Sequence, residues 1–245
     1  MAHAEQFRQP HAVLDLASRR WKARKIELLL NLPKQDRPIR MLEIGTGSGG
    51  IAHYFGTHPH QRYLVDAVDV HDSRLITDGF QYTHVEGTKL PFPDDYFDVV
   101  LTNHVIEHVG NAEDQFAHLC EVKRVLKPGG VGYLAVPNRW MLIEPHYKLA
   151  FLSWLPHIWR TPYLRATGKG MIYDCEPLQM RGLEHLFMRA NLEYRNMCIP
   201  ALRATFDIER SKSSAAQLLK WVPDTVIALF LPVIPTLIYR FSRPI

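Results

Sequence analysis

The stretch Met41-Leu42-Glu43-Ile44-Gly45-Thr46-Gly47-Ser48-Gly49-Gly50 decides the fold of this chain. The apolar run over Ile39–Ile44 predicts a buried strand, and a helical pattern resumes at Ile51-Ala52-His53-Tyr54-Phe55. A strand, a glycine turn and a helix in this order bring backbone N–H groups and a helix N-terminus close to a ligand. Glycine is needed there because the turn requires positive φ angles and because a side chain would hold the ligand away. The sequence therefore predicts an α/β fold with a ligand site at this turn.

Two ligand classes use this geometry. The spacing Gly45-x-Gly47-x-x-Gly50 matches the dinucleotide fingerprint of nicotinamide-dependent oxidoreductases. The same residues also read as Glu43-x-Gly45-x-Gly47-x-Gly49, which adds an acid before the first glycine. An acid at that position repels a pyrophosphate and suits a ligand that carries an ammonium or sulfonium charge. This second pattern resembles the first motif of the class I S-adenosylmethionine-dependent methyltransferases, in which the acid faces the methionine end of the cofactor.

Length, charge and cysteine content narrow the protein class. At 245 residues the chain is most economically one α/β domain with insertions. A formal net charge of +4 is too small to indicate a nucleic-acid partner. The three cysteines, Cys120, Cys175 and Cys198, are scattered and indicate reduced thiols. The first residues show no signal-peptide pattern. We therefore predict a cytoplasmic protein, and association with a membrane surface stays open.

An acid at the end of the second predicted strand completes the cofactor motif. Asp69 lies 22 positions beyond Gly47, near the end of the apolar segment 63–70. An acid at this distance is placed to accept hydrogen bonds from both ribose hydroxyls. Asp66 is the competing candidate, and Asp69 is favoured because the carboxyl end of a strand faces the binding crevice.

Further segments resemble the same family. Leu90-Pro91-Phe92 and Phe97-Asp98 follow its pattern, and Thr88 stands where an acid usually contacts the adenine. Asn103 and His104 fall on the methionine side. The resemblance implies S-adenosylmethionine as the cofactor, held by Glu43, Gly45, Thr46, Gly47, Gly49, Asp69, Val70, Thr88, Asn103 and His104.

Histidines supply the candidates for a general base. His104 and His108 follow the predicted strand Phe97–Thr102, and a helix starting there would put both on one face. The Glu-His pair Glu107-His108 also resembles the family's motif after strand 4, and we favour a structural role for Glu107. Some relatives bind a divalent metal here through a Glu–Glu–His set. His104 takes the place of the first acid, so we assign no metal ligands, and whether a metal is used stays open. The catalytic candidates are His108, His146 and His104.

The acceptor class follows from one absence and one unusual segment. The Asn/Asp-Pro-Pro-Tyr motif of enzymes that methylate nucleobase nitrogens does not follow strand 4, which leaves oxygen, carbon or sulfur as the acceptor atom. Aromatic and basic residues alternate after the fifth strand, in residues 138–175. Such a segment suits a membrane interface, a cap over an apolar substrate, or an insertion packed on its own domain. Glu144-Pro145-His146-Tyr147 is the polar cluster expected to face a pocket in this segment.

The remaining segments predict helices and strands in the order of the family. We expect strands at 81–86, 131–136, 192–199 and 236–241, and helices at 11–32, 113–126, 177–190 and 213–230, the last broken at Pro223. Lys127-Pro128-Gly129-Gly130 reads as a turn that ends a helix. The apolar stretch Trp221–Tyr239 holds Pro223, Pro232 and Pro235, so we do not expect it to span a membrane.

The predicted fold is a doubly wound, mostly parallel seven-stranded sheet with a cap after strand 5. We expect one methyltransferase domain over 1–245: a helical lid (1–38), a cofactor core (39–137), a substrate cap (138–175) and a C-terminal part (176–245). The predicted function is transfer of a methyl group from S-adenosylmethionine to a small-molecule or lipid-like acceptor at oxygen or carbon. The alternatives are a non-catalytic partner protein of the same fold and an NAD(P)-dependent oxidoreductase.

Overall fold

A computed structural model describes residues 15–209 and 213–245. The first residues of the helix predicted over 11–32 lie outside these ranges, and the described part is helical over Leu16–Leu30 (α2). Asp15 caps its first turn, with its side chain accepting a hydrogen bond from the amide of Ala17. Asn31 ends the helix in the left-handed conformation.

A seven-stranded sheet forms the centre of the protein, with the strand order β3-β2-β1-β4-β5-β9-β8. The strands are β1 (Ile39–Ile44), β2 (Tyr63–Asp69), β3 (Gln81–His84), β4 (Phe97–Asn103), β5 (Leu126–Pro137), β8 (Glu193–Asn196) and β9 (Thr236–Ser242). Strands β1 to β5 run parallel, and β9 is antiparallel to both of its neighbours. The predicted doubly wound, mostly parallel sheet with an antiparallel last strand is confirmed.

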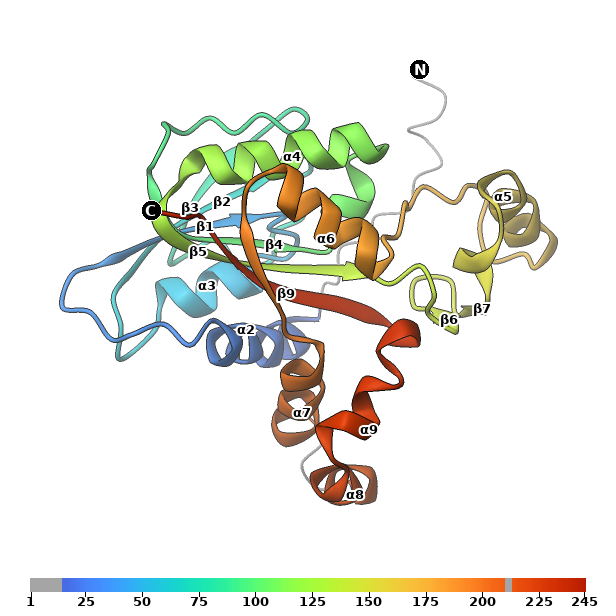
Figure 1. Ribbon diagram of the computed structural model, residues 1–245. Coiled ribbons are helices and arrows are strands. Elements are labelled where there is room, and N and C mark those ends of the chain that lie inside the picture. Colours follow the sequence, from blue (N-terminus) through green and yellow to red (C-terminus); the bar gives the residue numbers. More distant parts are fainter. Residues whose placement is uncertain (1–14, 210–212) are drawn as a thin grey trace.

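Helices cover both faces of this sheet (Figure 1). On one face lie α2, α3 and α7, and on the other lie α4 and α6. The helices described after α2 are α3 (Gly50–Gly56), α4 (Ala112–Val125), α5 (His157–Ala166), α6 (Met180–Arg189), α7 (Cys198–Ile208), α8 (Ser214–Trp221) and α9 (Asp224–Ala228), with 3-10 turns η1 (Ile106–His108), η2 (Leu152–Trp154) and η3 (Leu231–Val233).

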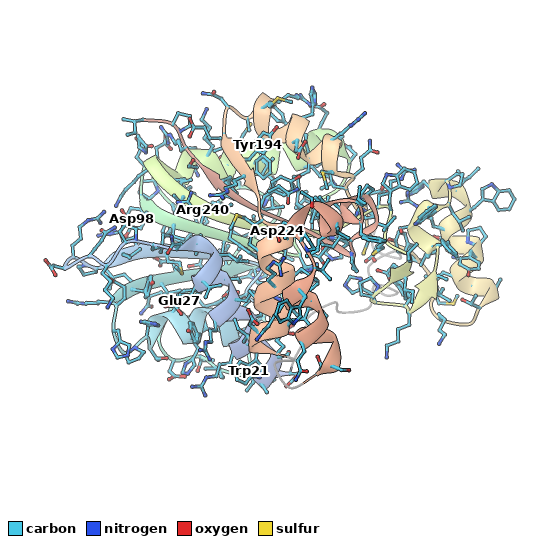
Figure 2. All side chains as sticks on the ribbon, turned by 60° about the horizontal axis from the view of Figure 1, so that its bottom comes forward. Trp21, Glu27, Asp98, Tyr194, Asp224 and Arg240 are labelled. Carbon is cyan, nitrogen blue, oxygen red and sulfur yellow. The ribbon has the colours of Figure 1, made fainter. Side chains whose placement is uncertain are left out.

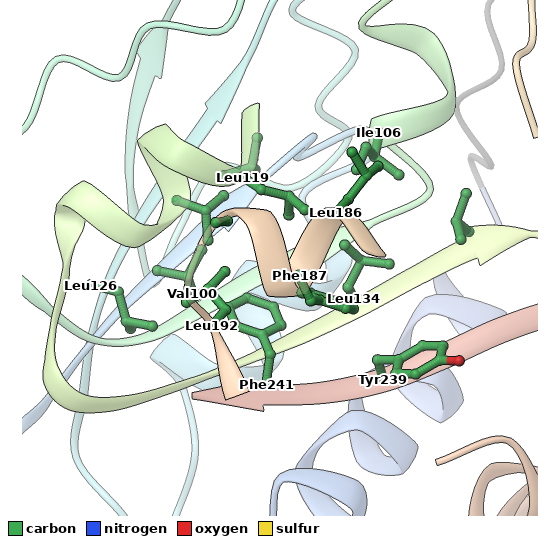
Figure 3. Close-up of a cluster of buried hydrophobic side chains, with 14 of the residues drawn as sticks. Val100, Ile106, Leu119, Leu126, Leu134, Leu186, Phe187, Leu192, Tyr239 and Phe241 are labelled. Atoms are coloured by element: carbon green, nitrogen blue, oxygen red, sulfur yellow. The ribbon is translucent and has the colours of Figure 1, made fainter. Parts of the chain in front are cut away.

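Alternation along the strands divides the apolar core into two layers. On β5, Tyr133 and Ala135 pack on the side of α2 and α3, and Leu134 and Val136 pack on the side of α4 and α6. The second layer is drawn in Figure 3, where Leu119 of α4 and Phe187 of α6 meet side chains of the sheet. Both faces of the central strands are therefore buried, as the apolar runs of β1 and β4 predict.

Contacts along the second half of α2 hold it against the rest of the protein (Figure 2). Glu27 accepts a hydrogen bond of 2.6 Å from the hydroxyl of Tyr54 on α3. Arg240 of β9 donates through Nε to the carbonyl of Leu30, at 3.2 Å. Lys25 is buried and forms an ion pair with Glu209 after α7. These contacts pack α2 on the domain.

Some predicted boundaries are wrong. The segment Lys127-Pro128-Gly129-Gly130 belongs to β5, which begins at Leu126 opposite Phe97, with a register shift in the pairing. The strand predicted over 192–199 ends at Asn196, and Cys198 begins α7. The side chain of Asn196 accepts a hydrogen bond from the amide of Cys198 and so closes the first turn of that helix.

Residues 138–175 form a small lobe beside the carboxyl ends of the strands (Figure 1). This lobe contains the hairpin β6 (Ile143–Glu144) and β7 (Leu149–Ala150), then η2 and α5. It has its own buried cluster, made of Tyr147, Leu149, Leu152, Leu164, Tyr173 and Cys175. The two ends of the lobe meet where Asn138 pairs with Leu178. We call residues 138–175 the cap.

The C-terminal helices are short. Pro223 separates α8 from α9, as predicted, and the segment Trp221–Tyr239 contains short helical turns before β9. Within the described residues, we find no helix whose length and apolarity would let it cross a bilayer.

Candidate functional site

The glycine turn lies at the carboxyl edge of the sheet, between two strands whose connections leave in opposite directions. Strand β1 pairs with β2 on one side and with β4 on the other, so the turn sits where open α/β sheets bind ligands. Gly45, Gly47 and Gly49 all have φ angles between 53° and 80°. A Cβ atom on Gly45 would lie 2.4 Å from Cγ2 of Val105, and one on Gly49 would lie 2.4 Å from the carbonyl oxygen of Ile76. Only glycine fits at these positions.

The turn is held by the end of β2. The amides of Gly45 and Thr46 donate to the carbonyl of Val68 at 2.8 and 3.3 Å. The hydroxyl of Thr46 donates to the same carbonyl at 3.1 Å. The amide of Gly47 donates to Oδ2 of Asp69 at 2.9 Å. Thr46 therefore has a structural role in the turn, and the carboxylate of Asp69 contacts the turn directly.

Glu43 is a buried carboxylic acid under the turn, 2 % exposed. Burial raises the pKa of its carboxyl to about 8, although a hydrogen bond from the Ala52 backbone and the charge of Arg19 act in the opposite direction. Its Oε2 atom is buried and has no hydrogen-bond partner among the described residues. A buried acid with an unpaired oxygen fits a cationic group such as the ammonium of the cofactor.

The other predicted cofactor residues spread along the edge of the sheet. Val70 follows Asp69 and is exposed, and Thr88 is partly exposed in the segment between β3 and β4. Asp66, the competing acid, lies within β2 opposite Leu42 and Gln81, away from the strand end.

Asn103 and His104 come at the end of β4, next to the glycine turn. The Oδ1 atom of Asn103 is buried without a hydrogen-bond partner among the described residues. His104 has a φ of 59°, and its amide donates to the carbonyl of Ala135 at 2.8 Å. Its Nδ1 lies 3.2 Å from Oε1 of the buried Glu107, and burial lowers the pKa of the imidazole despite this partner.

The prediction that His104 and His108 share one helical face is wrong. The helical segment is the single turn η1 (Ile106–His108), and His104 lies before it in the left-handed conformation. A residue with positive φ cannot be part of an α-helix, so the two imidazoles do not lie on one helical face. His104 pairs with Glu107, while His108 lies next to Cys175 and the cap.

The cap brings His146 to His108. The two rings are 6.3 Å apart between centroids, although the residues come from different parts of the fold. Nδ1 of His146 lies 2.8 Å from Oε1 of Glu144, which is 1 % exposed. The amide of Tyr147 donates to the other oxygen of Glu144, also at 2.8 Å. The hydrogen bond to Glu144 raises the pKa of His146. Glu144 and His146 therefore form a dyad in which the carboxylate orients the imidazole.

Two residues of α2 that sequence reasoning missed lie at the same edge. The Cβ of Arg19 packs closely against Gly50, since a Cβ atom added to Gly50 would lie 2.7 Å from it. The Nε atom of Arg19 is buried and has no hydrogen-bond partner among the described residues. Burial lowers the pKa of Arg19. Burial and the charges of Lys25 and Arg19 lower the pKa of Lys22 to about 7, and Lys22 in turn lowers the pKa of His104. Which cations of α2 turn inward depends on how this helix packs against the sheet, so the sequence alone did not identify these two residues.

The comparisons with known proteins agree with this geometry. The methyltransferase domain family matches residues 42–134. An S-adenosylmethionine-dependent methyltransferase from Mesorhizobium loti has a similar structure, with a TM-score of 0.58 over 93% of this chain and 100% of that chain at 17% identity. Residues 42–134 therefore match a methyltransferase domain, and the sheet that contains them has the fold of the class I S-adenosylmethionine-dependent methyltransferases. The predicted family, fold class, enzyme class and cofactor are confirmed.

Relatives in sequence are quinone-biosynthesis enzymes. The methyltransferase is 28% identical to the ubiquinone/menaquinone biosynthesis C-methyltransferase of Cupriavidus taiwanensis over 64% of its own length and 70% of that protein. It is 32% identical to the protein of the same name from Ectopseudomonas mendocina, over 52% of this chain and 54% of the relative. The alignments thus leave 30% of the first relative and 46% of the second unmatched.

Proposed function

We propose that this methyltransferase transfers a methyl group to an oxygen or carbon atom of a small apolar or lipid-like acceptor that carries an acidic hydroxyl. The observation that carries this proposal is the Glu144–His146 dyad of the cap, which lies beside His108 of η1. The name of the quinone-biosynthesis relatives favours carbon as the acceptor atom.

The protein's own task in such a reaction is to position two reactants and remove a proton. Bound S-adenosylmethionine supplies a methyl group that its sulfonium already activates. Glu43, the glycine turn, Asp69 and Asn103 would hold the cofactor, with Val70 and Thr88 toward the adenosine end. Glu144 fixes the proton on Nδ1 of His146, so the basic lone pair belongs to Nε2. That nitrogen would take the proton from the acceptor's hydroxyl, and the cap would hold the acceptor toward the methyl group that the bound cofactor would supply.

The surface of the cap supports an apolar acceptor. Its exposed apolar side chains include Ile158 at 74 %, Ile143 at 60 % and Trp159 at 59 % exposure. The exposed cations Lys148, Arg165 and Lys169 lie among them in the sequence. Trp221, Leu229 and Phe230 add exposed apolar side chains around α8 and α9. Rings and cations of this kind suit contact with an anionic lipid surface. We propose that the methyltransferase meets its acceptor at a membrane surface, and that residues 138–175 act as the substrate cap.

The division into lid, core, cap and C-terminal part belongs to the same proposal. The separate buried cluster of the cap supports its boundaries, and the contacts of α2 with α3 and β9 argue for a lid that stays in place.

Calorimetric titration with S-adenosylhomocysteine, with NADH in parallel, tests the cofactor half of the proposal. We expect micromolar affinity for the first and no binding of the second. An acceptor screen with quinol-like phenols and lipids, with and without vesicles, tests the other half. Binding of S-adenosylhomocysteine without turnover of any acceptor would favour the non-catalytic partner, and binding of NADH alone would overturn the proposal.

A further inference from the structure

Three side chains with metal-binding atoms meet between η1 and the last residues of the cap. Sγ of Cys175 lies 3.8 Å from Nδ1 of His108 and 4.0 Å from Oδ1 of Asp174. One ligand atom from each of the three residues lies within 4.8 Å of the others. Cys175 is buried, while His108 and Asp174 are partly exposed, so the cluster is open on one side.

The backbone around the cluster is fixed. The amide of Glu176 donates to the carbonyl of Glu107 at 2.8 Å, which ties the end of the cap to η1. The side chain of Gln115 on α4 donates to the carbonyl of Glu176 at 3.2 Å. These bonds hold Cys175 and His108 together although they are 67 positions apart. Preorganised ligands of this kind lower the ordering cost of binding an ion.

A further buried acid, Glu107, comes directly before His108 in the sequence. Glu107 is 1 % exposed, and its Oε2 atom has no hydrogen-bond partner among the described residues. A buried carboxylate with an unpaired oxygen is stabilised by positive charge nearby, and Glu107 is the immediate neighbour of His108 in η1.

The geometry and the chemistry of the three ligands agree with one class of ion. We propose that His108, Asp174 and Cys175 bind a divalent transition-metal ion, with Zn²⁺ as the expected occupant. Bond lengths of about 2.0–2.3 Å in a tetrahedral site correspond to ligand atoms roughly 3.3–3.8 Å apart. The ligand atoms lie within 4.8 Å of one another, so the cluster needs to contract by at most about 1.5 Å. Imidazole, carboxylate and thiolate together favour zinc over magnesium or calcium.

Binding would leave one coordination position open. Three protein ligands with a fourth position for water or substrate are typical of catalytic zinc sites, whereas structural sites close all four positions. The Cys175 thiol would release its proton to solvent on binding, and the thiolate and the Asp174 carboxylate would together balance the charge of the ion. His108 would then be a metal ligand, which leaves His146 as the base. The site stands on its own residues and does not depend on which acceptor is methylated.

Substitution of cobalt tests the site without any activity measurement. The full chain is stripped with a chelator and titrated with Co²⁺, and the sulfur-to-cobalt charge-transfer absorption is recorded together with the bound metal per chain. We expect one ion per chain and a charge-transfer band in the native protein. Cys175→Ser should abolish the band, and Asp174→Asn should weaken binding by on the order of tenfold or more. Cys120→Ser is the matched control, because that thiol is exposed on α4 and should leave the band unchanged.

Titration with S-adenosylhomocysteine separates loss of the metal site from loss of the fold. Cys175→Ser and His108→Gln should still bind the cofactor product while they fail to bind Co²⁺. A native protein that takes up no Co²⁺ while it binds S-adenosylhomocysteine would overturn the metal site and leave the methyltransferase function standing. An unchanged band in Cys175→Ser would also overturn it.

Discussion

The backbone amide of Gly47 donates a hydrogen bond of 2.9 Å to one carboxylate oxygen of Asp69, and the amide of His71 donates to the other oxygen at 3.2 Å. The acid at the end of β2 therefore holds the glycine turn after β1, in addition to its expected contact with the ribose. Cofactor binding and the shape of the turn depend on the same carboxylate.

Asp69→Asn should weaken binding of S-adenosylhomocysteine about 10–100-fold, because hydrogen bonds to a charged group contribute about 1.5–3 kcal/mol. The amide keeps one acceptor oxygen but presents N–H groups to a backbone amide or to a ribose hydroxyl. Calorimetric titration measures the change. Asp66→Asn is the matched control on the same strand, and we expect its affinity to stay within about twofold of the native value. Equal losses in the two variants would assign the ribose contact to neither acid.

Glu43 should make cofactor binding depend on pH. Burial raises the pKa of this acid from 4.5 to about 8 in the unliganded protein, so it is protonated at neutral pH. The cationic ammonium of the ligand favours the carboxylate, so binding releases a proton and affinity rises with pH up to about 8. Titrations in buffers with different ionisation enthalpies count that proton. Glu43→Gln should remove the pH dependence, and a native affinity that is flat between pH 5 and 8 would contradict the role of this residue.

Glu43 should also make the free energy of unfolding depend on pH, in the direction opposite to that of cofactor affinity. Because the folded protein keeps a proton that the unfolded chain loses above pH 4.5, the free energy of unfolding should fall as pH rises from 4.5 to about 8. The change attributable to Glu43 is at most a few kcal/mol, about 1.4 kcal/mol for each pH unit. Urea unfolding of the unliganded native protein and of Glu43→Gln at several pH values measures it. The difference between the two proteins should shrink toward low pH.

The Glu144–His146 dyad should set the acid limb of the pH–rate profile. A base acts when neutral, and Glu144 raises the pKa of His146, so the rate should rise as pH increases through a value above 6.5. His146→Gln should lower kcat by about 10²–10⁴-fold with little change in affinity for S-adenosylhomocysteine. Glu144→Gln should lower kcat less and move the acid limb to lower pH, because the imidazole loses its carboxylate partner. His157→Gln, at an exposed histidine of the cap, serves as the control with an unchanged profile.

Arg19 should bind the carboxylate of the cofactor's methionine end, because its partly buried guanidinium is close enough to Glu43 to act on the pKa of that acid. Arg19→Ala should weaken binding of S-adenosylhomocysteine by about tenfold or more and leave binding of methylthioadenosine, which lacks the amino-acid end, unchanged. Arg20→Ala, at the exposed neighbour, should change neither. Parallel losses for both ligands would mean that Arg19 only packs against Gly50.

Local patterns predicted the centre of this protein, and packing decided the rest. Gly45, Gly47 and Asp69 are visible in the sequence because the turn restricts both their residue types and their spacing. The positive φ of His104 is not visible in the sequence, and this backbone conformation is what separates the side chain of His104 from that of His108. Arg19 turns inward only because Leu30 and Glu27 fix α2 at its far end. The short distance between His108 and Cys175 could not be predicted from local patterns, because it depends on how distant parts of the chain pack together.

The apolar surface of the cap should bind the methyltransferase to lipid vesicles. Ile158 and Trp159 are exposed on α5, and burying one such side chain in lipid contributes about 1.5–3 kcal/mol. The double variant Ile158→Ser/Trp159→Ser should therefore bind vesicles that contain anionic lipid at least about tenfold more weakly in a sedimentation assay. Binding of the native protein should also weaken with salt, because Lys148, Arg165 and Lys169 are exposed cations of the cap. Leu28→Ser, at an exposed apolar residue of α2, is the control that should bind normally. If the native protein ignores these vesicles, or if the double variant binds them as well as Leu28→Ser does, the acceptor must reach the site from solution.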